Sequence, residues 1–375
     1  FEKTNRLWLD DFAEFMAIKE HFGNQALQKW DDKKAVARDP SALEKYRTML
    51  AEQIQYFKVT QYFFFKQWTE LKNYANQKGI QIIGDMPIYV AADSVEVWTK
   101  PELFQLDKER NPFFVAGVPA DQFSATGQLW GNPLYAWEEH KKQGYAWWIH
   151  RIEESFKIYD VLRIDHFKGF SDYWQVDGKA EVAKDGSWQP GPGYDLFKAV
   201  KEQLGDLPII AEDLGNIDDK ARKLLTDCNY PGMKILQFGF EDVSGESLDS
   251  PHYCIPHSIV YTGTHDNDVT NGWYNSLTEQ QQQYINDYTH RREDESICQA
   301  MIRQLFATVS NTAIATMQDV LDLPASSRMN VPSTIGGNWQ WRMQQSDLTQ
   351  DKKDFLAKMT TLYQRANQEK HNDEI

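Results

Sequence analysis

The segment "VLRIDHF", residues 161 to 167, ends an apolar run with a guanidinium, a carboxylate and an imidazole, supplied by Arg163, Asp165 and His166. On an extended strand Arg163 and Asp165 point to the same side, whereas His166 points away and is expected to pack. An arginine in bidentate contact keeps a carboxylate ionised, as a nucleophile requires. The segment is a candidate catalytic strand end, although ordinary solvated charges also explain it when it is taken alone.

Carboxylates recur just past the other β-rich runs, all of which lie after residue 79. The runs are residues 80–87, 160–167, 207–215, 233–240, 258–268 and 313–323, and their ends carry Asp85, Asp165, Glu212, Glu241 or Asp242, Asp266 and Asp319. The last run is equally compatible with a helix. Helical stretches separate the runs, which predicts βα units and a parallel sheet. We expect an α/β fold, a (β/α)8 TIM barrel with helical and loop insertions, whose strand ends share one active-site rim.

This spacing suits a retaining glycosidase, which needs two carboxylates about 5 to 5.5 Å apart. Neighbouring strands lie about 4.8 Å apart, and Asp165 and Glu212 end consecutive runs at equivalent positions. Asp266 lies two strands further on. Where three carboxylates crowd together, at least one should have a raised pKa, as a general acid needs.

Other roles remain open for some of these residues. "AEDLGN" could begin the helix expected at 217–228, with Asp213 as its cap, and His265 could be structural or a donor to sugar hydroxyls. "THDND" offers oxygen donors but lacks the spacing of a calcium-binding hand, so we rank metal binding below catalysis. We predict neither a metal nor a cofactor.

The composition narrows the function classes. A net charge of −15 argues against nucleic acid as a partner, and no apolar run approaches the roughly 20 residues of a membrane span. The three cysteines are isolated, so we expect reduced thiols in a cytoplasmic protein. Aromatic residues make up 13% of the chain; most should fill the core, but their planes also suit sugar rings.

The chain is expected to divide into residues 1–79, a helical insertion, 80–342, the catalytic barrel with its third to eighth strands, and 343–375, a C-terminal helix. A helix is predicted at 7–22, and a second, long one begins at the capping box Ser41 to Glu44 and ends near Gly79. Its aromatic residues Tyr56, Phe63, Phe64 and Trp68 are expected in the core. Residues 102–137 are predicted to form an ordered lid, and residues 174–193 a turn-rich excursion.

Six segments in unbroken order give the sequence a family resemblance. They are "GDMPIYVAADSVEVW", "GQLWGNPLYAW", "LRIDHFKGF", "IIAEDLG", "TGTHDND" and "MNVPSTIGGNWQWR". Together they resemble the amylomaltases, the 4-α-glucanotransferases or disproportionating enzymes of the α-amylase clan. The resemblance extends from about Phe1 to Arg342.

The resemblance implies roles for particular residues. Asp165 matches the nucleophile, Glu212 the general acid/base, and Asp266 the carboxylate that binds sugar hydroxyls in the transition state. The residues implied in sugar binding are Asp85, Asp121, Phe123, Gln128, Trp130, Arg163, His265 and Asn338. The chain departs from the family pattern at Ala120 and Gln122, which bears on acceptor binding by the lid, and at Ser333, which bears on loop geometry.

The implied activity is transfer of α-1,4-glucan segments between malto-oligosaccharides, with glucose and α-1,4-glucans as further partners. An α-amylase-like retaining hydrolase and a non-catalytic glucan-binding protein are the alternatives. We count six strands where a closed barrel has eight. The resemblance implies two further strands before the point matching Phe1, so the first two are expected to be absent from this chain, the preceding segment to be a partner, and this chain alone to be weakly active.

Overall fold

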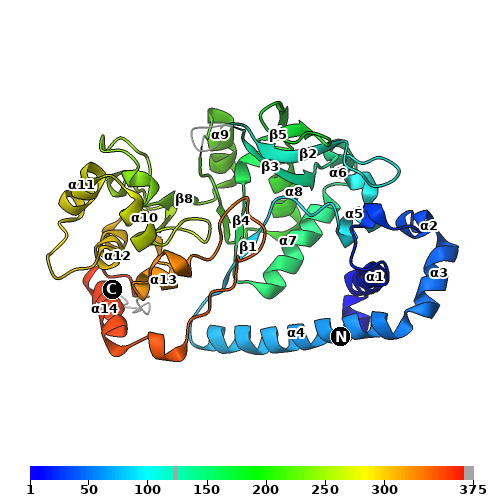
Figure 1. Cartoon of the computed structure of the whole chain (residues 1–375), viewed down its shortest axis with the longest axis horizontal. Helices are drawn as coiled ribbons and strands as arrows, with labels where there is room; N and C mark the ends of the chain where they lie inside the picture. Colours follow the sequence, from blue (N-terminus) through cyan, green and yellow to red (C-terminus); the bar gives the residue numbers. More distant parts are fainter. Residues whose placement is uncertain (121–125, 216, 367–375) are drawn as a thin grey trace, which may run out of the picture. The chain divides into compact units, whose positions relative to one another are not determined.

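The computed structural model describes residues 1–120, 126–215 and 217–366. The chain forms two compact units, Phe1–Tyr230 (unit 1) and Pro231–Ile375 (unit 2). Each unit is built on a three-stranded parallel sheet and its own helices (Figure 1).

The parallel strands coincide with the six runs that the sequence predicts, although β8 and β10 each begin one residue before their run. Unit 1 has the order β1-β4-β7, formed by β1 Ile83–Met86, β4 Val161–Ile164 and β7 Ile209–Ala211. Unit 2 has the order β10-β9-β8, formed by β8 Gly232–Ile235, β9 Ser258–Tyr261 and β10 Thr312–Ile314. The expectation of consecutive parallel strands is confirmed, and the uncertain last run is both strand and helix, because β10 is followed by α13.

The described residues also form α-helices in both units. Those of unit 1 are α1 Glu2–His21, α2 Lys33–Val36, α3 Pro40–Met49, α4 Ala51–Gln77, α5 Val95–Thr99, α6 Trp137–Lys142, α7 Ala146–Ile158, α8 Tyr194–Leu204 and α9 Asp219–Cys228. Those of unit 2 are α10 Thr270–Ser276, α11 Glu279–Thr289, α12 Ile297–Ala307, α13 Met317–Val320 and α14 Gln350–Leu362.

Unit 1 carries a second sheet, which the sequence did not predict. It is antiparallel with the order β3-β2-β5-β6, and its strands are β2 Phe114–Val118, β3 Gln128–Pro133, β5 Asp172–Asp177 and β6 Ser187–Pro190. The expected lid supplies β2 and β3, and the excursion at 174–193 supplies most of β5 and β6. Two segments far apart in sequence are thus tied together by backbone bonds, with Val115 opposite Val176.

The helical part before β1 differs from its prediction in two ways. The long helix begins one residue earlier, at Pro40, because the Asp39 carboxylate accepts bonds from the N–H groups of Ser41 and Ala42, and it breaks at Leu50 into α3 and α4. Aromatic residues of α4 expected in the core are exposed, Tyr56 by 62% and Phe63 by 52%. Aromatic residues lie all round α4, and α1, α3 and α7 pack against it without burying any of its residues.

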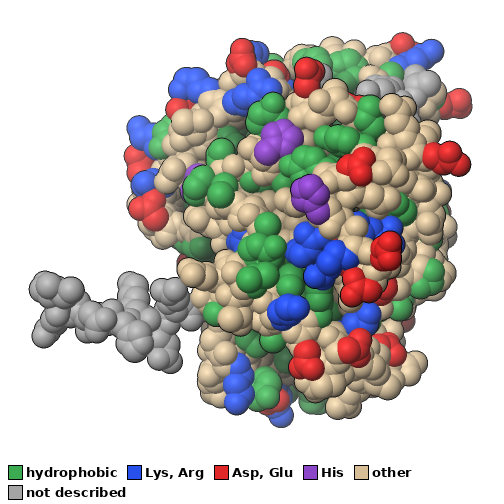
Figure 2. Space-filling model, turned by 90° about the vertical axis from the view of Figure 1, so that its left-hand side faces the viewer, with side chains coloured by type: hydrophobic (Ala, Val, Ile, Leu, Met, Phe, Trp, Pro, Cys, Tyr) green, Lys and Arg blue, Asp and Glu red, His purple; other side chains and the backbone are tan. Residues whose placement is uncertain are grey.

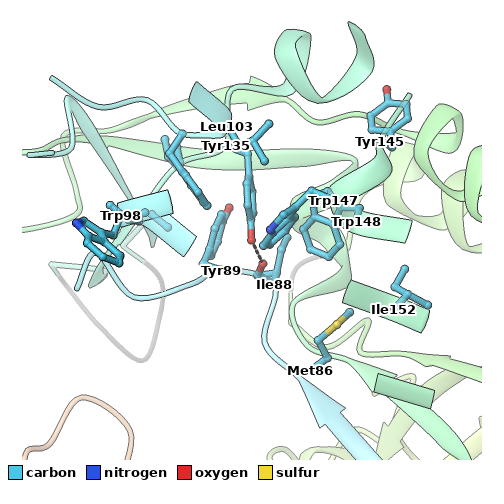
Figure 3. Packing of buried hydrophobic residues seen from close by; sticks show 14 of the residues in the cluster. Met86, Ile88, Tyr89, Trp98, Leu103, Tyr135, Tyr145, Trp147, Trp148 and Ile152 are labelled. Carbon is cyan, nitrogen blue, oxygen red and sulfur yellow. Dashed lines mark hydrogen bonds between the residues drawn. The ribbon is translucent and has the colours of Figure 1, made fainter. Parts of the chain in front are cut away.

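The segment that follows β1 packs into an aromatic part of the unit 1 core (Figure 3). Tyr135 stacks on Tyr89 with ring centroids 5.9 Å apart, and its hydroxyl donates to the Ile88 carbonyl at 2.7 Å. Arg151 donates to the Ile88 carbonyl at 3.0 Å and lies over the Trp148 ring. These contacts fix the path of the chain leaving β1, where the first site carboxylate lies.

On the face shown in Figure 2, acidic and basic side chains are interspersed rather than gathered by sign. Among the helices of the described ranges, none combines the length and apolar character that a bilayer crossing requires. The expected division at residues 79/80 and 342/343 stays a prediction.

Candidate active site

The carboxyl ends of β1 and β4 bring three charged groups of unit 1 together. Asp85 pairs in register with Arg163, and one nitrogen of Arg163, Nη1, donates to Asp85 Oδ1 at 2.6 Å and to Asp165 Oδ1 at 2.9 Å. The contact to Asp165 is therefore shared with Asp85 and is not the bidentate one that the sequence suggested. The Asp85 and Asp165 side chains are each 41% exposed, whereas that of Arg163 is 9% exposed. Arg163 is thus a buried guanidinium that donates to two accessible carboxylates.

Burial lowers the pKa of Arg163, but the charges of Asp85, Asp165 and Glu212 outweigh it and hold this pKa above its usual value. The guanidinium therefore stays charged and donates to both carboxylates. A carboxylate such as that of Asp165, accessible at a strand end, is placed to act as a nucleophile.

Glu212 lies beside Asp165 because their strands are in register. Ile164 pairs with Ala211, and the ladder continues from Glu212 N–H to the Ile164 carbonyl at 3.0 Å. The Glu212 carboxylate is held by two backbone donors: His166 N–H reaches Oε2 at 2.7 Å and Leu214 N–H reaches Oε1 at 2.9 Å. Its placement follows from the path of the main chain.

Burial raises the pKa of Glu212 to about 7, and the charge of Asp165 adds to the effect, while Arg163 and the two backbone bonds oppose it. A carboxyl group with this pKa is part protonated near neutrality, so it can give a proton and take one back. The raised pKa that the crowding of carboxylates suggested thus falls on Glu212.

His166 turns the chain between these two carboxylates. It adopts the left-handed conformation, with φ 50°, which aims its N–H at Glu212. Its ring meets Trp130 edge-on, with centroids 4.9 Å apart, which agrees with the expected packing role. Burial lowers the pKa of His166 to about 4, so the ring is neutral near pH 7.

The described part of the lid contributes Gln128 and Trp130, both from β3. Trp130 Nε1 donates to Gln128 Oε1 at 3.2 Å, and Asn132 on the same strand anchors it to the Val90 carbonyl at 2.9 Å. Through His166, Trp130 is placed beside the carboxylates of β4 and β7. Asp121 and Phe123, also expected to contact sugar, lie outside the described residues.

Unit 2 presents Asp266 and His265 in the loop that follows β9. Asn330 Nδ2 donates to Asp266 Oδ1 at 2.7 Å, and Arg328 Nη2 donates to the Asp266 carbonyl at 2.6 Å. His265 Nε2 lies 3.3 Å from Asp266 Oδ2, and its ring packs against Trp339 with centroids 5.1 Å apart. The Asp266 side chain is 44% exposed.

Asn330 and Arg328 were missed as functional residues. Asn330 lies inside the quoted segment "MNVPSTIGGNWQWR", but only its long-range contact to Asp266 shows its use. Asn338, which was expected to contact sugar, accepts from Val331 N–H at 3.0 Å and donates to Thr334 Oγ1 at 3.0 Å. It shapes the loop that also carries Trp339.

Other sequence expectations near the site differ in detail. The helix after β7 begins one residue after Asp218, which caps it, so Asp213 is not the cap. Asp319 is on α13 and buried, and is not at an exposed strand end. Within the described ranges, one group has metal-ligand spacing, His150, Glu153 and Glu154 on α7, and Lys157 already pairs with Glu154 there.

Comparison with known proteins relates the chain to a family. A family model described as 4-alpha-glucanotransferase matches residues 1–349. A 4-alpha-glucanotransferase of Streptococcus pneumoniae is 53% identical over 369 residues, which are 98% of this chain and 73% of that protein. One from Thermus thermophilus is 41% identical over 356 residues, 93% of this chain and 71% of that protein.

Solved structures agree. An amylomaltase from Streptococcus agalactiae, in complex with acarbose, superposes with a TM-score of 0.95 at 60% identity, covering 97% of this chain and 74% of that one. An amylomaltase from Corynebacterium glutamicum, 15% identical, shares the fold with a TM-score of 0.72 over 94% of this chain and 54% of that one.

The fold class is therefore the (β/α)8 barrel of amylomaltases, as the sequence predicts, and the protein class is that of retaining transglycosylases. The chain belongs to the 4-alpha-glucanotransferase family. Its relatives place it among the transferases of carbohydrate metabolism.

Proposed function

We propose that this chain transfers α-1,4-glucan segments between malto-oligosaccharides, with Asp165 as nucleophile and Glu212 as acid/base. The observation that carries the proposal is the pairing of two neighbouring carboxyl groups with different environments. Asp165 rests on a buried arginine, whereas burial raises the pKa of Glu212 to about 7.

The two groups divide a double displacement between them. Asp165 attacks the anomeric carbon as Glu212 protonates the departing glycosidic oxygen, and a glycosyl-enzyme forms. Glu212, now ionised, takes the proton from the 4-hydroxyl of an acceptor sugar, which attacks the same carbon and releases Asp165. Two inversions retain the α configuration.

The remaining residues are proposed to bind sugar. Asp266 and His265 hold hydroxyls of the distorted donor sugar, and Asp85 and Arg163 hold the donor side near the cleaved bond. Further contacts are assigned to Asp121, Phe123, Gln128, Trp130 and Asn338. Trp130 supports this assignment, because its ring is placed beside His166 at the edge of the carboxylate pair.

Chromatography of a maltotriose digest tests the reaction type. Transfer yields glucose together with oligomers longer than maltotriose, and total reducing ends stay constant. A rise in reducing ends with only shorter products supports an α-amylase-like hydrolase instead.

A trapped intermediate tests the roles. In Glu212→Gln an α-glucosyl fluoride still reacts, because fluoride leaves without a proton, but breakdown lacks its base. Mass spectrometry of the digested protein should find sugar on Asp165, and sugar on another carboxylate overturns the assignment. Asp165→Asn is the matched control and should carry no label.

A glucan-binding protein without activity is the remaining alternative. It predicts that calorimetry detects maltotriose binding while no turnover occurs and while Asp165→Asn binds as wild type.

We also propose a cytoplasmic location, supported by the free thiols of Cys228, Cys254 and Cys298. Fractionation of the source cells with antibody detection tests it.

A further inference from the structure

Asp319 is a carboxylate that the proposed reaction leaves without a role. It lies on α13, beyond the last parallel strand, and is 2% exposed. Both of its oxygens accept hydrogen bonds: Thr262 Oγ1 donates to Oδ2 at 2.7 Å, and Thr270 N–H donates to Oδ1 at 2.8 Å. A buried carboxylate with such partners is costly to disturb.

The two donors bracket the loop that carries Asp266. Thr262 follows β9 directly, and its own N–H continues the ladder to the Ile314 carbonyl at 3.2 Å. Thr270 is the first residue of α10. Both threonines are fully buried, so the Asp319 side chain links the two ends of residues 263–269 inside the core.

The loop between these ends has little room to shift. A Cβ on Gly263 would lie 2.9 Å from Gln237 Nε2, and one on Gly272 would lie 2.4 Å from the Asp268 carboxylate. Gln237 Nε2 donates to the Asp268 carbonyl at 2.9 Å, and Thr264 and Asn267 bond to each other inside the turn. A change at the ends is therefore passed on to Asp266 rather than absorbed.

From these contacts we infer that Asp319 is a positioning residue for the transferase reaction, holding Asp266 through the two ends of its loop. The inference rests on the role proposed for Asp266. Arg328 bonds the Asp266 carbonyl and Asn330 bonds its carboxylate, so the loop is fixed both at its ends and at Asp266 itself.

The test compares Asp319→Ala with Asp319→Asn. Asparagine keeps both contacts, since its oxygen accepts from Thr270 N–H and its amide donates to the Thr262 hydroxyl. We expect Asp319→Ala to lower kcat about 10- to 100-fold with KM changed less than about threefold, and Asp319→Asn to restore kcat to within about threefold of wild type.

Asp322→Ala is the matched control. Asp322 lies just past α13 and accepts from Asn271 Nδ2 of α10 at 3.0 Å. This contact joins Asp322 to α10 but does not involve Thr262 or Thr270. Its φ of 61° makes alanine strained there, so Tm should fall while kcat stays near wild type. Equal losses of kcat in Asp322→Ala and Asp319→Ala overturn the inference, because they indicate a general loss of stability.

A double variant separates this inference from the proposed function. If Asp319 acts through Asp266, adding Asp319→Ala to Asp266→Asn lowers kcat less than about twofold further. If Asp319 has a separate structural effect, the double variant instead shows the product of the two single-variant losses of kcat. If Asp266→Asn alone keeps wild-type kcat, the role proposed for Asp266 fails, and this inference fails with it. If Asp266→Asn loses activity but Asp319→Ala does not, the inference alone fails.

Thr262 supplies a second pair of variants should Asp319→Ala not fold. Thr262→Ser keeps the hydroxyl that bonds Asp319, whereas Thr262→Val keeps the shape and loses it. We expect the serine variant to match wild type and the valine variant to lose kcat about tenfold. Equal kcat in these two variants also overturns the inference.

Discussion

The proposed acid/base and the proposed transition-state carboxylate are held in opposite ways. In unit 1, Glu212 is bound by the backbone N–H groups of His166 and Leu214. In unit 2, Asp266 is bound by the side chains of Asn330 and Arg328, 64 and 62 residues away in sequence. Backbone donors remain whatever side chain they carry, so the Glu212 position should tolerate neighbouring substitutions that the Asp266 position does not.

The difference has a physical origin in the elements. Glu212 and Asp165 directly follow paired strands, where the ladder fixes each N–H. Asp266 lies five residues past β9, in a loop with no strand partner of its own among the described residues, so other side chains must hold it. A carboxylate is thus held by nearby backbone donors in unit 1 and by side chains that are distant in sequence in unit 2.

The largest expected effect separates the two carboxylates by role. Asp165→Asn removes the nucleophile and should lower kcat by about 10⁴-fold, whereas Asp266→Asn removes transition-state stabilisation and should lower it about 10²- to 10³-fold. Steady-state rates with maltotriose measure both. Asp227→Asn, an exposed residue paired with Lys223, is the control expected at wild-type rate. Equal losses in Asp165→Asn and Asp266→Asn contradict the division of roles.

A second prediction concerns the pH dependence of Glu212. Its acid form is needed for the first displacement, so kcat/KM should fall as pH rises through about 7. Arg163 lowers this pKa, and removing its charge favours the protonated form. Arg163→Ala should therefore move the alkaline limb to higher pH while lowering kcat/KM about 100-fold. An alkaline limb that stays in place in the variant shows that another group controls it.

Linkage gives the same titration a stability readout. The folded-state pKa of Glu212 lies above its ordinary value of 4.5, so between these pH values the folded state holds a proton that the unfolded state has lost. The free energy of unfolding should fall as pH rises from about 4.5 to 7, by at most about 1.4 kcal/mol per pH unit from this group. Denaturant titration of wild type against Glu212→Gln isolates the contribution.

A third, smaller effect is expected in unit 2. Asn330→Ala removes a bond to the Asp266 carboxylate and should lower kcat about tenfold, because a hydrogen bond to a charged group contributes roughly 1.5 kcal/mol. Asn330→Asp, which places a like charge 2.7 Å from Asp266 Oδ1, should be worse. Should alanine and aspartate variants both keep wild-type kcat, the side-chain support described for unit 2 has no functional weight.

The sequence could predict the parts of this arrangement that depend on local pattern. The six strands, the polar residues just past their ends and the pairing of Asp165 with Glu212 follow from apolar runs and strand alternation. Asn330, Arg328 and Asp319 could not be assigned in this way, because their partners are set by tertiary packing. The same limit explains the misplaced aromatics of α4, since a helix pattern does not tell how many of its faces are covered.

Substitution at His166 gives the smallest effect on Glu212 and the sharpest test of backbone support. His166→Asn keeps the N–H that bonds Glu212, and asparagine tolerates the left-handed conformation better than most residues. The alkaline limb near pH 7 should therefore shift by less than about 0.3 pH units in this variant.

The pH dependence of stability on the acid side should change in His166→Asn. Because burial lowers the pKa of His166 to about 4, the unfolded state takes up the proton first as pH falls below 6.5. Wild type should lose stability between pH 6.5 and 4 from this group, and His166→Asn should not. Kinetic pH profiles and denaturant titrations measure the two limbs separately. An alkaline limb displaced by a full pH unit in His166→Asn means that the imidazole itself, and not only the backbone N–H of this residue, affects the pKa of Glu212, and the contrast between the two units then fails.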